Sequence, residues 1–104
     1  MNVRFAPQEV RFRITRQELE QLRVGRAVLM TVTLPGQHAF QASVGIDRFG
    51  NWRLDSDPTG LWLTLPKNSL DQFDGVPTAE GVEHRFELAN GGAINLVFEV
   101  DVRS

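Results

Sequence analysis

The sequence predicts an α+β fold in which about seven mainly antiparallel strands form a curved sheet or a small barrel with two short helices. Two observations support this prediction. Apolar and polar residues alternate over most of the chain, which is typical of strands with one buried face. Residues 10–46 and 61–102 also share a pattern of strand, short helix and hairpin, with apolar, capping, acidic and Gln positions repeating at an offset of 51. We therefore expect one domain over residues 1–104, a pseudo-twofold duplication of a βαββ unit.

The first copy begins with an amphipathic strand and a capped helix. Apolar side chains alternate with arginines over residues 10–14, after a segment, Met1–Gln8, that we expect to be a flexible lead-in. Thr15 and Glu18 have the spacing of a capping box, in which each side chain accepts a hydrogen bond from the other residue's backbone amide. Gly25 suits the left-handed position that ends many helices. The pattern predicts a helix of about two turns.

Two further strands complete the first copy. Residues 28–34 and 40–46 alternate between apolar and polar side chains, and Pro35–Gly36 breaks the run between them. A brief strand follows at Trp52–Leu54, before the polar stretch Asp55–Gly60 that separates the two copies. Together these segments predict a hairpin and one additional strand.

The second copy repeats this order. Its helix is expected to begin at Pro66, since proline is tolerated at the first helical position, and to end at Gly75. Strands are predicted over residues 82–88 and 94–102, and Asn90–Gly92 between them is a strong hairpin-turn signal.

The opening segment Val10–Leu22 resembles that of small bacterial proteins of unknown function, which begin with an Arg-rich strand followed by Thr-x-x-Glu and a Leu-rich helix. Leu63–Pro66 is similar to their second copy, where a strand, a proline and a helix recur. The resemblance covers nearly the whole chain and implies a duplicated strand–helix–hairpin unit. Such families have no established activity, so the resemblance assigns no catalytic or binding residue.

The composition excludes several classes of function. The chain has no cysteine, which excludes disulfides, thiolate nucleophiles and zinc ribbons. No segment approaches the roughly 20 apolar residues of a membrane-spanning helix. Met1–Gln8 lacks the apolar core of a signal peptide, and we therefore expect a cytoplasmic location.

No set of residues predicts catalysis. The chain contains no Gly-x-Ser-x-Gly motif, and its serines have no His or Asp context. His38 is expected to be solvated beside a turn. His84 falls on the apolar face of a strand, where a hydrogen-bonded structural role is the favoured interpretation. We expect no catalytic residue and no enzyme activity.

The best candidate for a metal site is Asp55 with Asp57, with Asp47 nearby, because carboxylates two residues apart can share a hard cation. Asp57–Gly60, however, has the composition of a type I turn. The turn is the favoured interpretation, and we expect neither a bound metal nor a cofactor.

A binding surface is predicted on the outward faces of the two equivalent strands. Arg11 and Arg13 lie on this face in the first copy, and Trp62 lies on it in the second. If the two strands are neighbours, these side chains form a Trp/Arg patch of the kind enriched in binding hot spots. Alternatively, Trp62 is covered by the second helix, by the lead-in or by a second subunit.

Three functions are compatible with these features. The first is a small interaction or accessory domain that self-associates as a homodimer or binds a protein partner through Arg11, Arg13 and Trp62. The alternative is a nucleic-acid or small anionic ligand binder that uses the N-terminal arginines, since residues 1–26 carry a net charge of +3 against −5 for residues 27–104. The acidic pI and the single lysine argue against nucleic acid. The third is an enzyme or ligand-binding barrel with a metal at Asp55 and Asp57.

Overall fold

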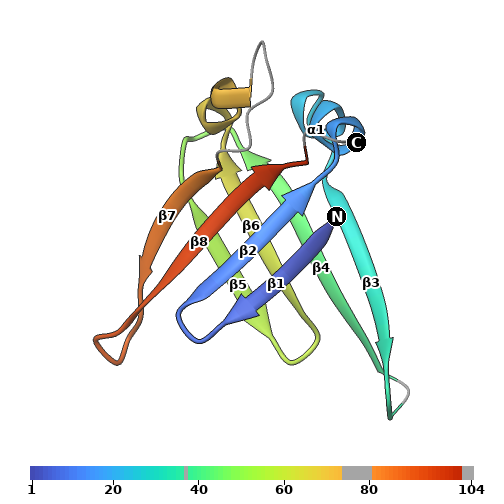
Figure 1. Ribbon diagram of the computed structural model, residues 1–104, viewed down its shortest axis with the longest axis vertical. Helices are drawn as coiled ribbons and strands as arrows, with labels where there is room; N and C mark the ends of the chain where they lie inside the picture. Colours follow the sequence, from blue (N-terminus) through green and yellow to red (C-terminus); the bar gives the residue numbers. More distant parts are fainter. Residues whose placement is uncertain (37, 74–80, 102–104) are drawn as a thin grey trace.

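The computed structural model describes residues 1–36, 38–73 and 81–101, and in them the protein is mostly β, with two small helices (Figure 1). The elements follow the order β1 (Asn2–Ala6), β2 (Glu9–Ile14), α1 (Arg16–Arg23), β3 (Val28–Leu34), β4 (His38–Asp47), β5 (Arg53–Asp57), β6 (Gly60–Pro66), the 3₁₀ helix η1 (Lys67–Phe73), β7 (Val82–Glu87) and β8 (Ala93–Val100).

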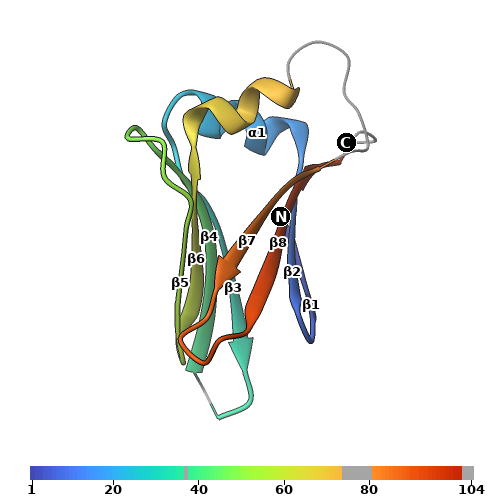
Figure 2. The same ribbon diagram turned by 90° about the vertical axis from the view of Figure 1, so that its left-hand side faces the viewer.

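The strands form two separate four-stranded sheets that face each other (Figure 2). The first sheet has the order β1-β2-β8-β7, and the second has the order β3-β4-β6-β5. Within each sheet the outer pairs are antiparallel hairpins, whereas the two central strands, β2 with β8 and β4 with β6, run parallel. Each sheet therefore combines a hairpin from the first half of the chain with a hairpin from the second half.

This arrangement corrects the predicted fold class. The prediction of about seven mainly antiparallel strands in a single curved sheet or barrel is wrong, because eight strands form two mixed sheets. Alternation of apolar residues fixes which face of a strand is buried but not which strands are neighbours, and the parallel central pairs join segments far apart in the sequence. The expected lead-in is also corrected, since Asn2–Ala6 forms edge strand β1, paired with β2.

The two halves of the chain have the same order and register of elements. The bounds of β5 and β6 lie 51 residues after those of β1 and the start of β2, and the pairing of Asn2 with Arg13 recurs as that of Arg53 with Thr64. The β7–β8 register repeats that of β3–β4 at an offset of 54, with Val28 against Val44 and Val82 against Phe98. Exchanging the halves thus converts one sheet order into the other.

Both helices lie at one end of the sandwich, opposite the four hairpin turns (Figures 1 and 2). Each helix connects the two sheets, because α1 runs from β2 to β3 and η1 runs from β6 to β7. The predicted capping box is present, with the Glu18 amide donating to Thr15 Oγ1 at 3.1 Å and the Thr15 amide donating to Glu18 Oε1 at 2.9 Å. Gly25 has the positive φ, 84°, expected after the helix. The predicted end of the second helix at Gly75 lies outside the described residues.

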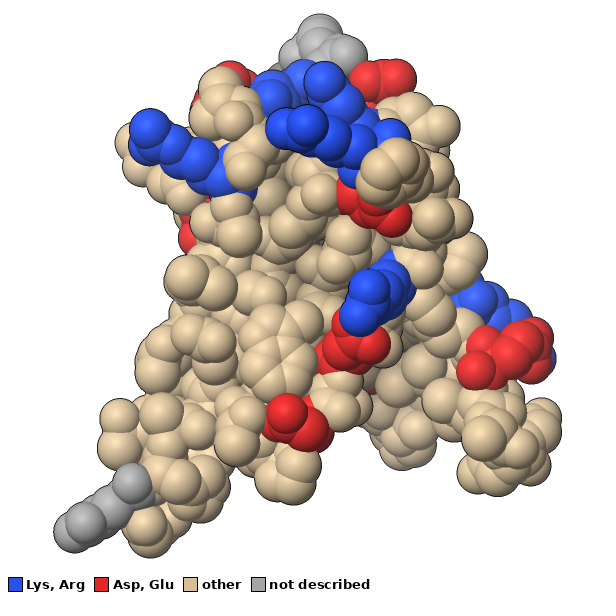
Figure 3. Space-filling view, turned by 180° about the vertical axis from the view of Figure 1, so that it is seen from behind, with Lys and Arg blue, Asp and Glu red and all other residues tan. Residues whose placement is uncertain are grey.

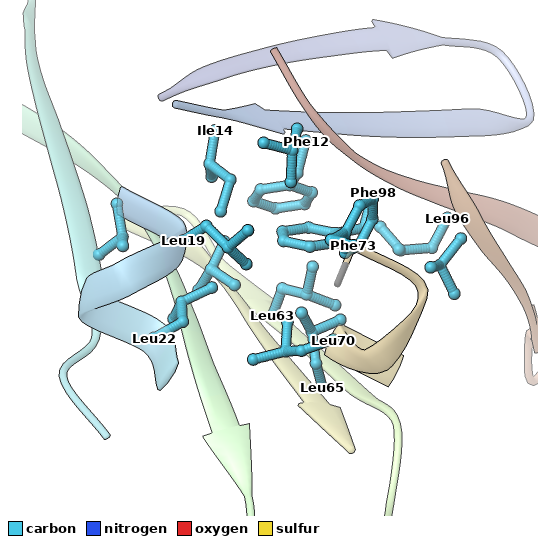
Figure 4. Packing of buried hydrophobic residues seen from close by; sticks show 14 of the residues in the cluster. Phe12, Ile14, Leu19, Leu22, Leu63, Leu65, Leu70, Phe73, Leu96 and Phe98 are labelled. Carbon is cyan, nitrogen blue, oxygen red and sulfur yellow. The ribbon is translucent and has the colours of Figure 1, made fainter. Parts of the chain in front are cut away.

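The core fills the helical end of the sandwich (Figure 4). Phe12 and Phe98 come from paired strands of the first sheet and are fully buried, and Phe73 of η1 meets Phe98 edge-on at 5.7 Å between ring centroids. Leu63 of the second sheet and Leu22 of α1 point into the same cluster. Burying each such side chain contributes roughly 1.5–3 kcal/mol, so both helices are held by the core that they close.

Candidate ligand-binding cleft

A cleft of about 470 Å³ opens between the sheets at the end formed by the hairpin turns. Its lining residues come from the inner faces and turn-proximal ends of seven strands and are predominantly apolar. They are Phe5, Val10, Phe40, Leu54, Ser56, Asp57, Gly60, Leu61, Phe86, Glu87, Leu88 and Ile94. We call this set the hairpin cleft.

The hairpin cleft exists because the two ends of the sandwich are closed differently. At the other end, Leu19 and Leu22 of α1 and Leu70 and Phe73 of η1 fill the space between the sheets. The described residues include no helix over the hairpin turns, where Figure 2 shows the strands ending in loops. The inner-face side chains there keep contact with solvent, and Phe5 is 64% exposed.

One side of the hairpin cleft adjoins a column of stacked rings. Trp52, directly before β5, stacks on His84 of β7 with ring centroids 4.8 Å apart and planes at 7°. His84 meets Phe86 edge-on, again at 4.8 Å, and Phe86 lines the cleft. His84 therefore links the edges of the two sheets, as a half-buried structural residue does. His38 is exposed at the start of β4.

Oxygen-bearing side chains lie among the apolar residues of the hairpin cleft. Ser56, Asp57 and Glu87 contribute a hydroxyl and two carboxylates. Asp57 Oδ1 accepts hydrogen bonds from the Thr59 hydroxyl at 2.6 Å and the Thr59 amide at 2.7 Å, and these bonds lower the pKa of Asp57. Glu87 Oε1 lies 3.3 Å from Arg85 Nε. The polar part of the cleft therefore presents negative charge and hydrogen-bond acceptors.

Arg11 and Arg13 lie on the outer face of the first sheet, where both bind Glu99 of the neighbouring strand β8. Arg13 Nε is 2.8 Å and Arg11 Nη1 is 3.1 Å from the Glu99 carboxylate, whose side chain is only 8% exposed. Charged hydrogen bonds of this length are among the stronger polar interactions in proteins. An anionic ligand would have to compete with Glu99 for both guanidinium groups.

Trp62 lies on the outer face of the second sheet, in a row that crosses β3, β4 and β5 at Leu29, Ser43 and Asp55. It is half-buried, and its ring lies over Gly60, where an added Cβ would come within 2.8 Å of the indole. Arg11, on the other sheet, faces away from Trp62. The structure therefore does not bring Arg11 and Arg13 together with Trp62, although it leaves open a binding role for each surface.

The aspartates of the candidate metal site have protein partners. Asp55 Oδ2 is 2.6 Å from Arg53 Nε, Asp57 accepts from Thr59, and Asp47 Oδ1 accepts the Phe49 amide at 2.8 Å. Across residues 1–36, 38–73 and 81–101, no group of three or more His, Asp or Glu side chains could hold a metal ion. The predicted turn at Asp57–Gly60 is present and joins β5 to β6.

Sequence analysis did not identify the hairpin cleft. Phe40, Phe86 and Ile94 occupy period-two apolar positions that were assigned to a closed core, and Phe5 was assigned to the lead-in. A usable signal was present, because these large apolar residues lie close to hairpin turns, where strand ends emerge from a sandwich. The pattern alone could not show that the helices would close only one end.

Fold and cleft together define a class: a small protein of two facing, four-stranded mixed sheets, with helices over one end and an apolar cleft at the other. The chain belongs to a family of unknown function (DUF7009), whose model matches residues 1–103. This agrees with the resemblance to proteins of unknown function noted in the sequence. No curated protein and no solved structure matches the chain. In the described part of the chain, neither helix has the length and apolar character needed to cross a membrane.

Proposed function

We propose that this protein is a small binding module that holds an apolar or amphiphilic small molecule in the hairpin cleft. The observation that supports the proposal most directly is the cleft itself. Its volume of about 470 Å³ falls within the range of roughly 300–1,000 Å³ found for small-molecule sites. Its walls are mainly apolar and aromatic with a few oxygen atoms, which is the usual composition of such sites.

Exposed apolar side chains add to this argument. Phe5 and Leu88 both contribute to the cleft and are 64% and 45% exposed. Leaving a large apolar side chain in water forgoes roughly 1.5–3 kcal/mol relative to full burial. A bound apolar molecule would cover these side chains and recover part of that free energy.

The charges of the cleft narrow the class of ligand. Asp57 and Glu87 make its polar part negative, and the hydrogen bonds from Thr59 keep Asp57 ionised at neutral pH by lowering its pKa. A ligand with an apolar body and a neutral hydrogen-bond donor or a cationic end would complement this arrangement. A fatty-acid carboxylate would be repelled by the two carboxylates.

The proposal is tested by filling the cleft. Ser56 occupies the position that Phe5 occupies in the first half of the chain, 51 residues earlier, and it is exposed inside the cleft. S56F places an aromatic ring in the space that the ligand would need. The matched control is N95F, which makes a similar change on the outward face of β8.

The readout is the fluorescence of N-phenyl-1-naphthylamine, a neutral apolar amine that brightens in apolar surroundings. We expect saturable binding to the wild-type protein and N95F, and at least about tenfold weaker binding to S56F, equivalent to ~1.4 kcal/mol. Absence of saturable binding to the wild type, or equal binding to S56F, would contradict the proposal.

We also infer that the chain arose by duplication of a hairpin–helix–hairpin unit. The support is the shared element order and register of its two halves, with offsets of 51 and 54 residues. The hairpin cleft contains residues at equivalent positions in the two halves, such as Val10 with Leu61 and Phe40 with Ile94. A two-sided, nearly symmetric apolar cleft is a natural consequence of such an origin.

A further inference from the structure

Edge strand β3 differs from the other edge strands of the two sheets. An edge strand presents unpaired backbone N–H and C=O groups, and proteins commonly protect such edges with charged side chains. Strand β1 carries Arg4, β5 carries Arg53, Asp55 and Asp57, and β7 carries Glu83, Arg85 and Glu87. Strand β3, with the sequence VLMTVTL over seven residues, carries no charged side chain.

Apolar side chains are exposed on both faces of this edge. Leu29, on the outer face, is 61% exposed, and Val32, on the inner face, is 44% exposed. In Figure 3 the Lys, Arg, Asp and Glu side chains gather over the helical end and over β5, and the side of the sheet that carries β3 is uncharged. The edge thus combines an open hydrogen-bonding row with apolar flanks, which favours another strand as its occupant.

We propose that a second copy of this chain pairs with β3 in an antiparallel, edge-to-edge contact, joining the two second sheets into one sheet of eight strands. A twofold axis at Thr31 places this residue opposite Thr31 of the second copy and Leu29 opposite Thr33 of the second copy. Threonine pairs opposite each other on adjacent strands are favourable. The proposal does not depend on ligand binding in the hairpin cleft.

The lack of charge on β3 favours a second copy over an unrelated strand. In a twofold contact, each residue near the axis meets its own equivalent, so any charged residue there would face a like charge. Strand β3 is the edge strand among the described residues that avoids this repulsion along its whole length. An unrelated partner strand would impose no such restriction and could pair with complementary charges.

The test uses sedimentation velocity on the full chain over a concentration series. We expect the wild-type protein to form dimers, and T31K and T31E each to weaken dimerisation by at least about tenfold, or ~1.4 kcal/mol. An equimolar mixture of T31K and T31E should recover dimers, because opposite charges then meet at the axis. N2K, which adds the same charge to edge strand β1, should dimerise like the wild type.

Amide hydrogen exchange on the wild-type protein provides an independent reading if either variant fails to fold. We expect amides of β3 to exchange more slowly as the protein concentration rises, with no such change in β1, β5 and β7. The proposal is overturned by a wild type that stays monomeric at every concentration, by T31K dimerising as well as N2K, or by protection that appears on another edge. Pairing of β3 only with a foreign strand peptide would also overturn it.

Discussion

At the residue scale, the charged side chains of this protein mainly bind one another. Arg11 and Arg13 hold the nearly buried carboxylate of Glu99, and Asp55 is paired with Arg53. These contacts supply a structural reason for charges that the sequence offered as candidates for anion or metal binding. Arginines engaged by a carboxylate are a weaker attraction for phosphate than free ones, and the anion-binding alternative therefore stays a prediction without structural support.

A pH titration tests one of these local contacts. The Thr59 hydroxyl and amide lower the pKa of Asp57, so T59A should raise that pKa toward the ordinary aspartate value, while the remaining amide bond keeps it below that value. Because the folded pKa is lowered, the stabilisation is present above the unfolded pKa and is lost as the pH falls through the folded pKa. Carboxyl NMR shifts followed against pH measure the effect; identical curves for T59A and wild type would contradict it.

At the scale of elements, local chemistry was sufficient for most predictions. The capping box at Thr15 and Glu18, the glycine stop at Gly25 and the turn at Asn90–Gly92 depend on interactions within a few residues, and all are present. Strand β1 was missed because it is short and has only two inward apolar side chains before Pro7. Its strand conformation depends on pairing with β2, which no local signal announces.

Strand β6 provides a test of packing on an outer sheet face. An added Cβ at Gly60 would lie 2.5 Å from the Gln41 carbonyl oxygen and 2.8 Å from the Trp62 ring. Since backbone cannot easily move away, G60A should lower the free energy of unfolding by about 1–3 kcal/mol. The control is G45A on the neighbouring strand β4, where nothing lies within 4 Å and a near-neutral effect is expected. Urea unfolding measures both, and equal effects would show that Trp62 does not pack on Gly60.

At the scale of the whole molecule, the pairing of strands decided what the sequence could not. Every strand pattern was compatible with several neighbours, and the parallel pairs β2–β8 and β4–β6 join residues from opposite halves of the chain. This exchange of hairpins creates two sheets, sends both helices to one end and leaves the hairpin cleft at the other. It also places Trp62 on a different sheet from Arg11 and Arg13, so the expected Trp/Arg patch is not assembled.

The most direct test of the central claim, that the hairpin cleft is a binding site, is methyl NMR during titration with N-phenyl-1-naphthylamine. The cleft contains methyl groups from Val10, Leu54, Leu61, Leu88 and Ile94, and other methyl groups lie far from it in the helical-end core. The account predicts saturable shifts concentrated in the cleft methyls of the wild-type protein and absent in S56F. Shifts concentrated elsewhere, or no saturable shift in the cleft methyls, would contradict it.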